Sequence, residues 1–342
     1  MKILLVYTGL KPGGITSEIR LLEHGLRSHG VEVVTAGDIA SVNRHMRSGD
    51  PLVHVFSCVP SAVTAATMIM ARARRLPLIW SPIIHPNRMH SWRGYGLIRV
   101  AMSVFDRAAP RAARFVDGVI TATEAEQDFF RRAGARRVEL IRPPVDKTTA
   151  RPEGEALARV RASFGIGDEP TVLFVARPGS SRRKGVPFAR AAFRELRQRM
   201  PAARLMLLGQ DGDSDLAGEP GAVPTGWVSL ERVADVYDAA DVLLVASVYE
   251  CLPRAVIEAW SHEMPVAVTE GIALAPLVRG RAGIVAPYGD VSAMASAMET
   301  ILADPALGRT YGRAGRALVD DGFLLSSYLS HTLEFYGTVG AS

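Results

Sequence analysis

The sequence predicts an α/β protein made of two doubly wound, Rossmann-like domains. Short apolar runs rich in leucine and β-branched residues alternate with amphipathic segments of helical length, which is typical of parallel sheets covered by helices on both faces. The alternation breaks once, in a polar, charge-rich stretch at residues 143–170, and then starts again. A chain of 342 residues is also long enough for two domains, each with its own core.

The first half contains alternating candidate strands and helices, with helices such as 16–28 and 124–133 between the strands. The strands are expected at residues 2–7, 31–35, 52–56, 78–81, 118–121 and 138–141. We place the interdomain linker in the polar stretch at residues 143–170, so that the first domain covers residues 1–147.

The second half repeats this rhythm and is expected to form a domain over residues 148–322. Its strands are expected at residues 171–176, 204–208, 242–246, 265–269 and 283–286. Its helices are expected at about residues 186–200, 230–238, 254–262, 291–303 and 305–319. Ligands of open α/β sheets bind beyond the carboxyl ends of the strands, so we expect a ligand cleft between the two domains.

Composition excludes several classes of protein. Hydrophobic residues make up 48% and charged residues 22% of the chain, as in ordinary globular proteins. The uncharged stretch 51–71 is divided by His54 and Pro60 into a strand and a helix, so it does not predict a membrane span. The apolar run at the start is too short for a signal peptide, which predicts a cytoplasmic protein. Cys58 and Cys251 are far apart and give neither a disulfide framework nor zinc-ligand spacing.

Positive charge is concentrated in the first half of the chain. Residues 1–150 carry 21 Lys and Arg against 12 Asp and Glu, whereas the remainder carries 19 against 23. The excess arginines either attract an anionic partner or are simply solvated on helix surfaces. No zinc-finger spacing, RNP-like aromatic motif or basic heptad helix is present, so a nucleic-acid partner is not expected.

Two glycine-containing loops between a strand and a helix are candidate phosphate sites. Residues 8–15 include Gly13 and Gly14, whose backbone amides at a helix N-terminus suit a phosphate, although a strand-to-helix turn needs glycine in any case. Residues 175–185 contain four cations before the next helix, which suit a diphosphate; the alternative is an exposed basic loop. These cations are Arg177, Arg182, Arg183 and Lys184.

The strongest motif follows the apolar strand at residues 242–246. Glu250 lies in the loop after this strand and Glu258 on the following helix, so the two carboxylates can reach different hydroxyls of one ligand. The alternative is a simple Arg254–Glu258 pair at i,i+4 on a solvated helix face.

Glu250 and Glu258 are separated by seven residues, and this spacing resembles the signature of retaining GT-B glycosyltransferases, specifically glycosyltransferase family 4. The surrounding AADVLLVASVYECLPRAVIEAWSHEMPVAVT, followed by GIVAPYGD, is similar to that family almost position for position. Further landmarks appear in order: Gly13-Gly14, Arg177 and Lys184, LMLLGQDGD, and TGWVSLERVADVYDAADV. The resemblance covers the whole second half and, more loosely, the first half. It also implies that a last helix, within residues 323–342, returns toward the first domain.

The resemblance implies a role for each matching residue. Arg177 and Lys184 would bind the diphosphate of a nucleotide-sugar donor, helped by the backbone of Gly13 and Gly14. Glu258 would bind the ribose, and Glu250 with the amides of Cys251 and Leu252 would hold the sugar. The backbone of Trp227 and Val228 would border the base. His85 is the expected histidine facing the sugar, with His90 as the reserve.

The chain departs from the family pattern in three places. Arg177 and Lys184 are separated by six residues instead of the usual four, so Arg182 or Arg183 is an alternative phosphate ligand. Cys251 replaces the usual glycine and adds a side chain beside the sugar, and Arg142-Pro143-Pro144 replaces a proline-asparagine-glycine. The aspartates at 211, 213 and 215 resemble a calcium loop but lack its glutamate, so no metal is expected.

The resemblance implies an enzyme that transfers a sugar from a nucleoside-diphosphate sugar to an acceptor hydroxyl with retention of configuration, and it is expected to be metal-independent. UDP is expected over GDP, no further cofactor is implied, and the acceptor is a saccharide or small molecule such as a natural product. The apolar segment at residues 95–105 favours a core-covering helix over membrane-surface contact. The alternatives are a GT-B nucleotide-sugar epimerase or hydrolase, and a non-catalytic nucleotide or nucleic-acid binder.

Overall fold

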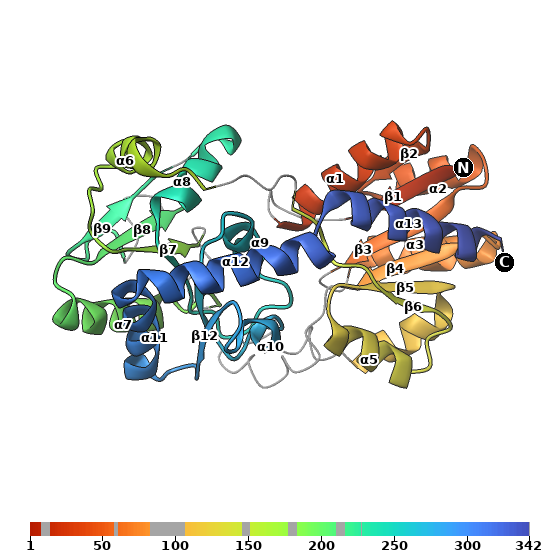
Figure 1. Ribbon diagram of the computed structural model, residues 1–342. Helices are drawn as coiled ribbons and strands as arrows, with labels where there is room; N and C mark the ends of the chain where they lie inside the picture. Colours follow the sequence, from red (N-terminus) through yellow and green to blue (C-terminus); the bar gives the residue numbers. More distant parts are fainter. Residues whose placement is uncertain are drawn as a thin grey trace. The chain divides into compact units, whose positions relative to one another are not determined.

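The computed structural model describes residues 1–7, 14–57, 61–82, 107–145, 151–176, 183–209, 216–226 and 228–341, without the side chains of residues 14, 15 and 230. The chain divides into two compact units (Figure 1). Unit 1 contains Met1–Asp146 and Gly322–Ser342, and unit 2 contains Lys147–Asp321. The last segment of the chain therefore belongs to the same unit as the first.

Unit 1 is built on a parallel sheet with the strand order β2-β1-β3-β4-β5-β6. Most positions in these strands are buried, because the sheet is covered on both faces and apolar side chains are needed on each. The strands are β1 (Lys2–Val6), β2 (Glu32–Ala36), β3 (Leu52–Ser57), β4 (Leu78–Pro82), β5 (Gly118–Thr121) and β6 (Val138–Leu140).

The helices of unit 1 include one from the far end of the sequence. They are α1 (Gly14–Ser28), α2 (Ile39–Arg47), α3 (Ala62–Ala73), a helix over residues 107–115, α5 (Glu124–Arg132) and α13 (Leu325–Gly340). The side chain of Phe335 on α13 packs directly over Gly118, where an added Cβ would lie 2.7 Å from the ring. The hydroxyl of Tyr336 lies 2.6 Å from Nδ1 of the buried His54 in β3, so α13 is tied to the centre of this sheet.

Unit 2 repeats the architecture with the strand order β12-β11-β10-β7-β8-β9, again all parallel. Its strands are β7 (Thr171–Val175), β8 (Arg204–Leu208), β9 (Ala222–Pro224), β10 (Val242–Val245), β11 (Val266–Thr269) and β12 (Gly283–Ala286). The expected strands are all present, and the prediction of two doubly wound parallel sheets is confirmed. The short edge strand β9 was not expected.

The helices of unit 2 cover both faces of this sheet (Figure 1). They are α6 (Gly154–Ala162), α7 (Val186–Arg199), the 3₁₀ turn η2 (Leu230–Arg232), α8 (Val233–Ala239), α9 (Arg254–Ser261), α10 (Ala275–Val278), α11 (Val291–Ala303) and α12 (Pro305–Gly322). Apolar faces of α7 and α11 complete a core with β7, β8 and β10. No helix in the described ranges is both long and apolar enough to cross a bilayer.

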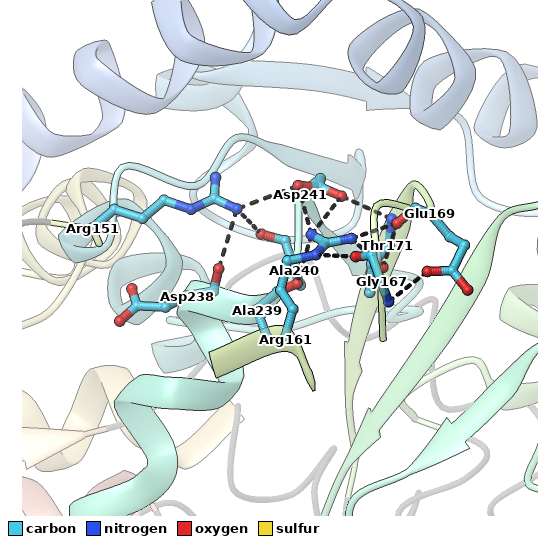
Figure 2. Close-up of polar contacts among 9 residues, drawn as sticks. All are labelled: Arg151, Arg161, Gly167, Glu169, Thr171, Asp238, Ala239, Ala240 and Asp241. Carbon is cyan, nitrogen blue, oxygen red and sulfur yellow. Dashed lines mark hydrogen bonds and ion pairs between the residues drawn. The ribbon is translucent and has the colours of Figure 1, made fainter. Parts of the chain in front are cut away.

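The division between the two units, at Asp146 and Lys147, falls inside the stretch where the linker is expected, but this stretch also contains an unexpected helix, α6. Arg161 anchors this helix to the rest of unit 2. Its side chain is only 8% exposed, although the helix as a whole is polar. Its guanidinium donates hydrogen bonds to the carbonyls of Gly167, Glu169 and Ala239, at 2.6, 2.5 and 3.0 Å, and lies 3.3 Å from both carboxylate oxygens of Asp241 (Figure 2). A single buried cation thus fastens α6 to the turns that lead into β7 and β10.

Arg151 reinforces this cluster from the start of the described part of unit 2. Its guanidinium donates to the carbonyls of Asp238 and Ala240, at 3.2 and 2.6 Å, and lies 3.3 Å from Asp241 (Figure 2). Since Asp238 and Ala240 terminate α8, the two arginines fix the carboxyl end of that helix.

Candidate active site

The candidate site lies where the strand order of unit 2 changes direction. The chain runs from β7 to β8 and β9 on one side and then returns to place β10 on the other side of β7. Ligands of doubly wound sheets bind beyond the carboxyl ends of the strands at such a point. The loops that follow β7 and β10 carry Lys184 and Glu250, respectively.

The structure brings these two residues into contact. The Lys184 Nζ lies 2.8 Å from Oε1 of Glu250, and a guanidinium nitrogen of Arg183 lies 2.7 Å from the same oxygen. The other carboxylate oxygen accepts a hydrogen bond from the Ser247 hydroxyl at 3.2 Å. The Glu250 side chain is 12% exposed and that of Lys184 is 17% exposed, so the pair is partly protected from water.

Close backbone packing holds this contact in place. Gly185 has a φ of +68°, and a Cβ on it would lie 1.9 Å from the carbonyl oxygen of Ala246, at the end of β10. The amide of Val248 also donates to the carbonyl of Arg183 at 2.9 Å. The loop after β7 and the loop after β10 are therefore joined by main chain as well as by side chains.

Electrostatics keep the Glu250 carboxylate charged. Burial alone would raise its pKa, but the neighbouring charges of Lys184 and Arg183, with their hydrogen bonds, outweigh burial and lower the pKa of Glu250 from 4.5 to about 2. Glu250 is thus a permanent anion at any physiological pH.

The lowered pKa predicts a pH-dependent contribution to stability. A carboxyl group whose pKa falls on folding stabilises the protein above its unfolded-state pKa, and this contribution is lost as the pH falls toward the folded-state value. Between pH 6 and pH 3 we expect the unfolding free energy of the wild type to fall by about 2 kcal/mol more than that of Glu250→Gln. Urea unfolding at a series of pH values measures the difference.

Glu155→Gln is the matched control. The Glu155 side chain is 95% exposed, and its carboxylate lies 3.8 Å from a guanidinium nitrogen of Arg159. Its pH profile should follow that of the wild type. Identical profiles for Glu250→Gln and the wild type would contradict the assigned ion pair.

The second carboxylate of the motif, Glu258, lies on α9. The hydroxyl of Tyr237 on α8 donates a hydrogen bond to Glu258 Oε2 at 2.6 Å. Arg254 Nε is 3.6 Å from Oε1, which is an ion pair without a hydrogen bond at that distance. The interpretation of Arg254 and Glu258 as a plain surface pair is therefore incomplete, since a buried tyrosine also binds the acid.

Some of the remaining candidate residues lie in the described part of the chain, and the others lie outside it. Gly14 begins α1 in unit 1, and Cys251 and Leu252 continue the Glu250 loop toward α9. Val228 lines a cavity of about 320 Å³ next to Thr225 and Ser229. The predictions for Gly13, His85, His90, Arg177, Arg182 and Trp227, and those for Cys58, residues 95–105 and the aspartates at 211, 213 and 215, lie outside the described residues.

Two residues that bind the glutamates of the motif, Ser247 and Tyr237, were not predicted from the sequence. Ser247 lies just after β10, three residues before Glu250, whose carboxylate it binds. Tyr237 has the pattern of a core aromatic residue, and it is indeed only 1% exposed. Nothing in the local sequence shows that its hydroxyl reaches an acid 21 residues further on.

Comparison with known proteins identifies the class of this fold. Residues 169–304 match the protein-family model described as "Glycosyl transferases group 1". A solved structure of Anabaena Alr3699/HepE, in complex with UDP-glucose, superimposes with a TM-score of 0.75 over 99% of this chain and 100% of that one, at 18% identity. The fold is thus GT-B, two parallel six-stranded sheets covered by helices, as found in glycosyltransferases.

Curated sequences are also similar to this chain. GDP-mannose-dependent alpha-(1-6)-phosphatidylinositol monomannoside mannosyltransferase of Mycolicibacterium smegmatis is 31% identical over 52% of this chain and 50% of its own length. Alpha-D-kanosaminyltransferase of Streptomyces kanamyceticus is 26% identical over 80% of this chain and 73% of its own. The chain spans about half the length of the first of these relatives. Residues 169–304 thus form a glycosyltransferase group 1 domain, which confirms the predicted resemblance for this part of the chain.

Proposed function

We propose that the protein is a glycosyltransferase that moves a sugar from a nucleoside-diphosphate sugar to an acceptor hydroxyl with retention of configuration. The observation that carries this proposal is the contact between Lys184 and Glu250 at the switch point of a group 1 domain. It places a cation suited to a diphosphate directly beside a permanent anion suited to sugar hydroxyls.

The hydrogen-bonding capacity of these groups supports their roles. An ammonium has three donor hydrogens, so a Lys184 that gives one to Glu250 keeps two for phosphate oxygens. The Glu250 carboxylate has about four acceptor positions, of which Arg183, Lys184 and Ser247 occupy three. One position is left for a sugar hydroxyl. The same group therefore fixes the sugar and positions the cation that binds its leaving group.

Cleavage of the sugar–phosphate bond develops negative charge on the departing diphosphate, and preorganised cations stabilise it. We assign this task to Lys184 and Arg177, with the backbone of Gly13 and Gly14. The leaving phosphate oxygen takes the proton of the acceptor hydroxyl, which attacks the same face of the sugar. His85 and the amides of Cys251 and Leu252 would contact the sugar, Trp227 and Val228 the base, and no metal is required.

The donor is proposed to carry UDP, with GDP as the alternative. The UDP-glucose complex of HepE favours the first, and the name of the Mycolicibacterium relative favours the second. The acceptor is proposed to be a saccharide or other small molecule. A cytoplasmic location fits a donor of this kind.

An assay of donor consumption tests the proposal. The protein is incubated with a panel of UDP and GDP sugars, with and without a pool of saccharide acceptors, and release of nucleoside diphosphate and the anomeric configuration of the product are recorded. We expect release that depends on acceptor and an axial or equatorial linkage matching that of the donor. Full turnover without acceptor would instead favour an epimerase or hydrolase, and nucleotide binding without any turnover would favour a binding protein.

A further inference from the structure

Tyr237 occupies an unusual position for a core tyrosine. Its side chain is 1% exposed, yet its hydroxyl is directed at Glu258, whose side chain is 33% exposed. The O···O distance of 2.6 Å is that of a strong, charge-assisted hydrogen bond. The phenol therefore bridges the core of unit 2 and the partly open face on which Glu258 lies.

The ring of Tyr237 is itself held in place by its neighbours. It stacks on the imidazole of His262, with ring centroids 5.5 Å apart and an interplanar angle of 13°. The Nδ1 atom of His262 lies 2.7 Å from a carboxylate oxygen of Asp238, the residue after Tyr237. Helix α8 is thus held against α9 and its C-cap residue by three side-chain contacts: Tyr237 with Glu258, Tyr237 with His262, and Asp238 with His262.

This arrangement determines which oxygens of Glu258 can meet a ligand. Tyr237 takes one acceptor position on Oε2, and Arg254 is too distant to take one on Oε1. A carboxylate has about four such positions, so enough remain for the two adjacent hydroxyls of a ribose. Because burial and the charge of Glu258 raise the pKa of Tyr237 well above 10, the phenol stays a donor throughout the working pH range.

We infer that Tyr237 is a positioning residue for nucleotide binding: its hydroxyl fixes the Glu258 carboxylate in the orientation that receives the ribose hydroxyls of the donor. This inference rests on the proposed function. It distinguishes Tyr237 from the other buried tyrosines, because loss of its hydroxyl should weaken the binding only of ligands that carry the ribose hydroxyls.

The test compares Tyr237→Phe with wild type in calorimetric titrations of UDP and GDP, and of their 2′,3′-dideoxy analogues. We expect the nucleotide that binds wild type to bind Tyr237→Phe about tenfold more weakly, which is the effect of losing one hydrogen bond to a charged group. Affinity for the dideoxy analogue should be the same in both proteins. In a Glu258→Ala background, which removes the acceptor of the Tyr237 hydroxyl, the Tyr237→Phe change should have no further effect on ribonucleotide affinity.

Tyr336→Phe is the matched control, since it removes a buried tyrosine hydroxyl with a 2.6 Å contact in unit 1. It should leave all these affinities unchanged. Equal ribonucleotide affinity in Tyr237→Phe and wild type, or an equal loss with the dideoxy analogue, would overturn the inference alone. If the wild type bound neither UDP nor GDP, the proposed function would fail and this inference with it.

Discussion

Replacing Lys184 with alanine is expected to lower the turnover of the sugar-transfer reaction by about 10²–10³-fold, the usual cost of removing one preorganised charge contact to a transition state. The structure adds a second reason for a large effect. Lys184 lies 2.8 Å from Glu250 and is one of two cations on that carboxylate, so its loss also frees the group assigned to the sugar. Steady-state rates of nucleotide release at saturating donor measure the change.

Lys2→Ala is the control for this prediction. Lys2 also pairs with a glutamate, Glu32 at 3.4 Å, but it lies at the start of β1 in unit 1. Its removal should leave turnover within twofold of the wild type. Turnover of Lys184→Ala close to that of the wild type would refute the assignment of Lys184 to the leaving diphosphate.

Replacing Arg161 with alanine is expected to destabilise unit 2 by about 3–5 kcal/mol, because each of the three carbonyls that lose its guanidinium as a donor costs about 1–3 kcal/mol when left unsatisfied. The variant would leave the carbonyls of Gly167, Glu169 and Ala239 without this donor, and Asp241 without its most buried cation (Figure 2). Hydrogen exchange followed by mass spectrometry measures the change separately in each unit. Protection should fall in β7 and β10, while β1 and β3 in unit 1 should keep theirs.

Arg159→Ala, two residues earlier on α6, provides the contrast. Arg159 is 75% exposed and pairs only loosely with Glu155, so its loss should change stability by less than about 0.5 kcal/mol. Equal exchange profiles for Arg161→Ala and Arg159→Ala would show that the cluster in Figure 2 does not stabilise the unit.

Much of the fold follows from the sequence because its strands are buried on both faces. Such strands appear as short apolar runs, and β5 (Gly118–Thr121) and β12 (Gly283–Ala286) begin and end at the expected residues. Two elements gave no such signal. β9 is a three-residue edge strand with half-exposed side chains, and α6 depends on Arg161, whose partner Ala239 lies 78 residues away.

The sequence predicted several candidate residues of the site but not the contacts between them. The motif identified Lys184, Glu250 and Glu258 as residues that follow strands of one domain. The contact between Lys184 and Glu250 depends on β7 lying next to β10, and the local sequence does not show the order of the strands in the sheet. The hydroxyl of Tyr237 was missed for a similar reason, since only the packing of α8 against α9 brings it to Glu258.

The central claim is that the carboxyl edge of the second sheet binds the diphosphate of a nucleotide through Lys184. Calorimetric titration of the wild type and Lys184→Ala with UDP and with GDP tests it most directly. One of the two nucleotides is expected to bind the wild type in a 1:1 complex and to bind Lys184→Ala at least about tenfold more weakly. Equal affinity in the two proteins, or no binding of either nucleotide to the wild type, would contradict it.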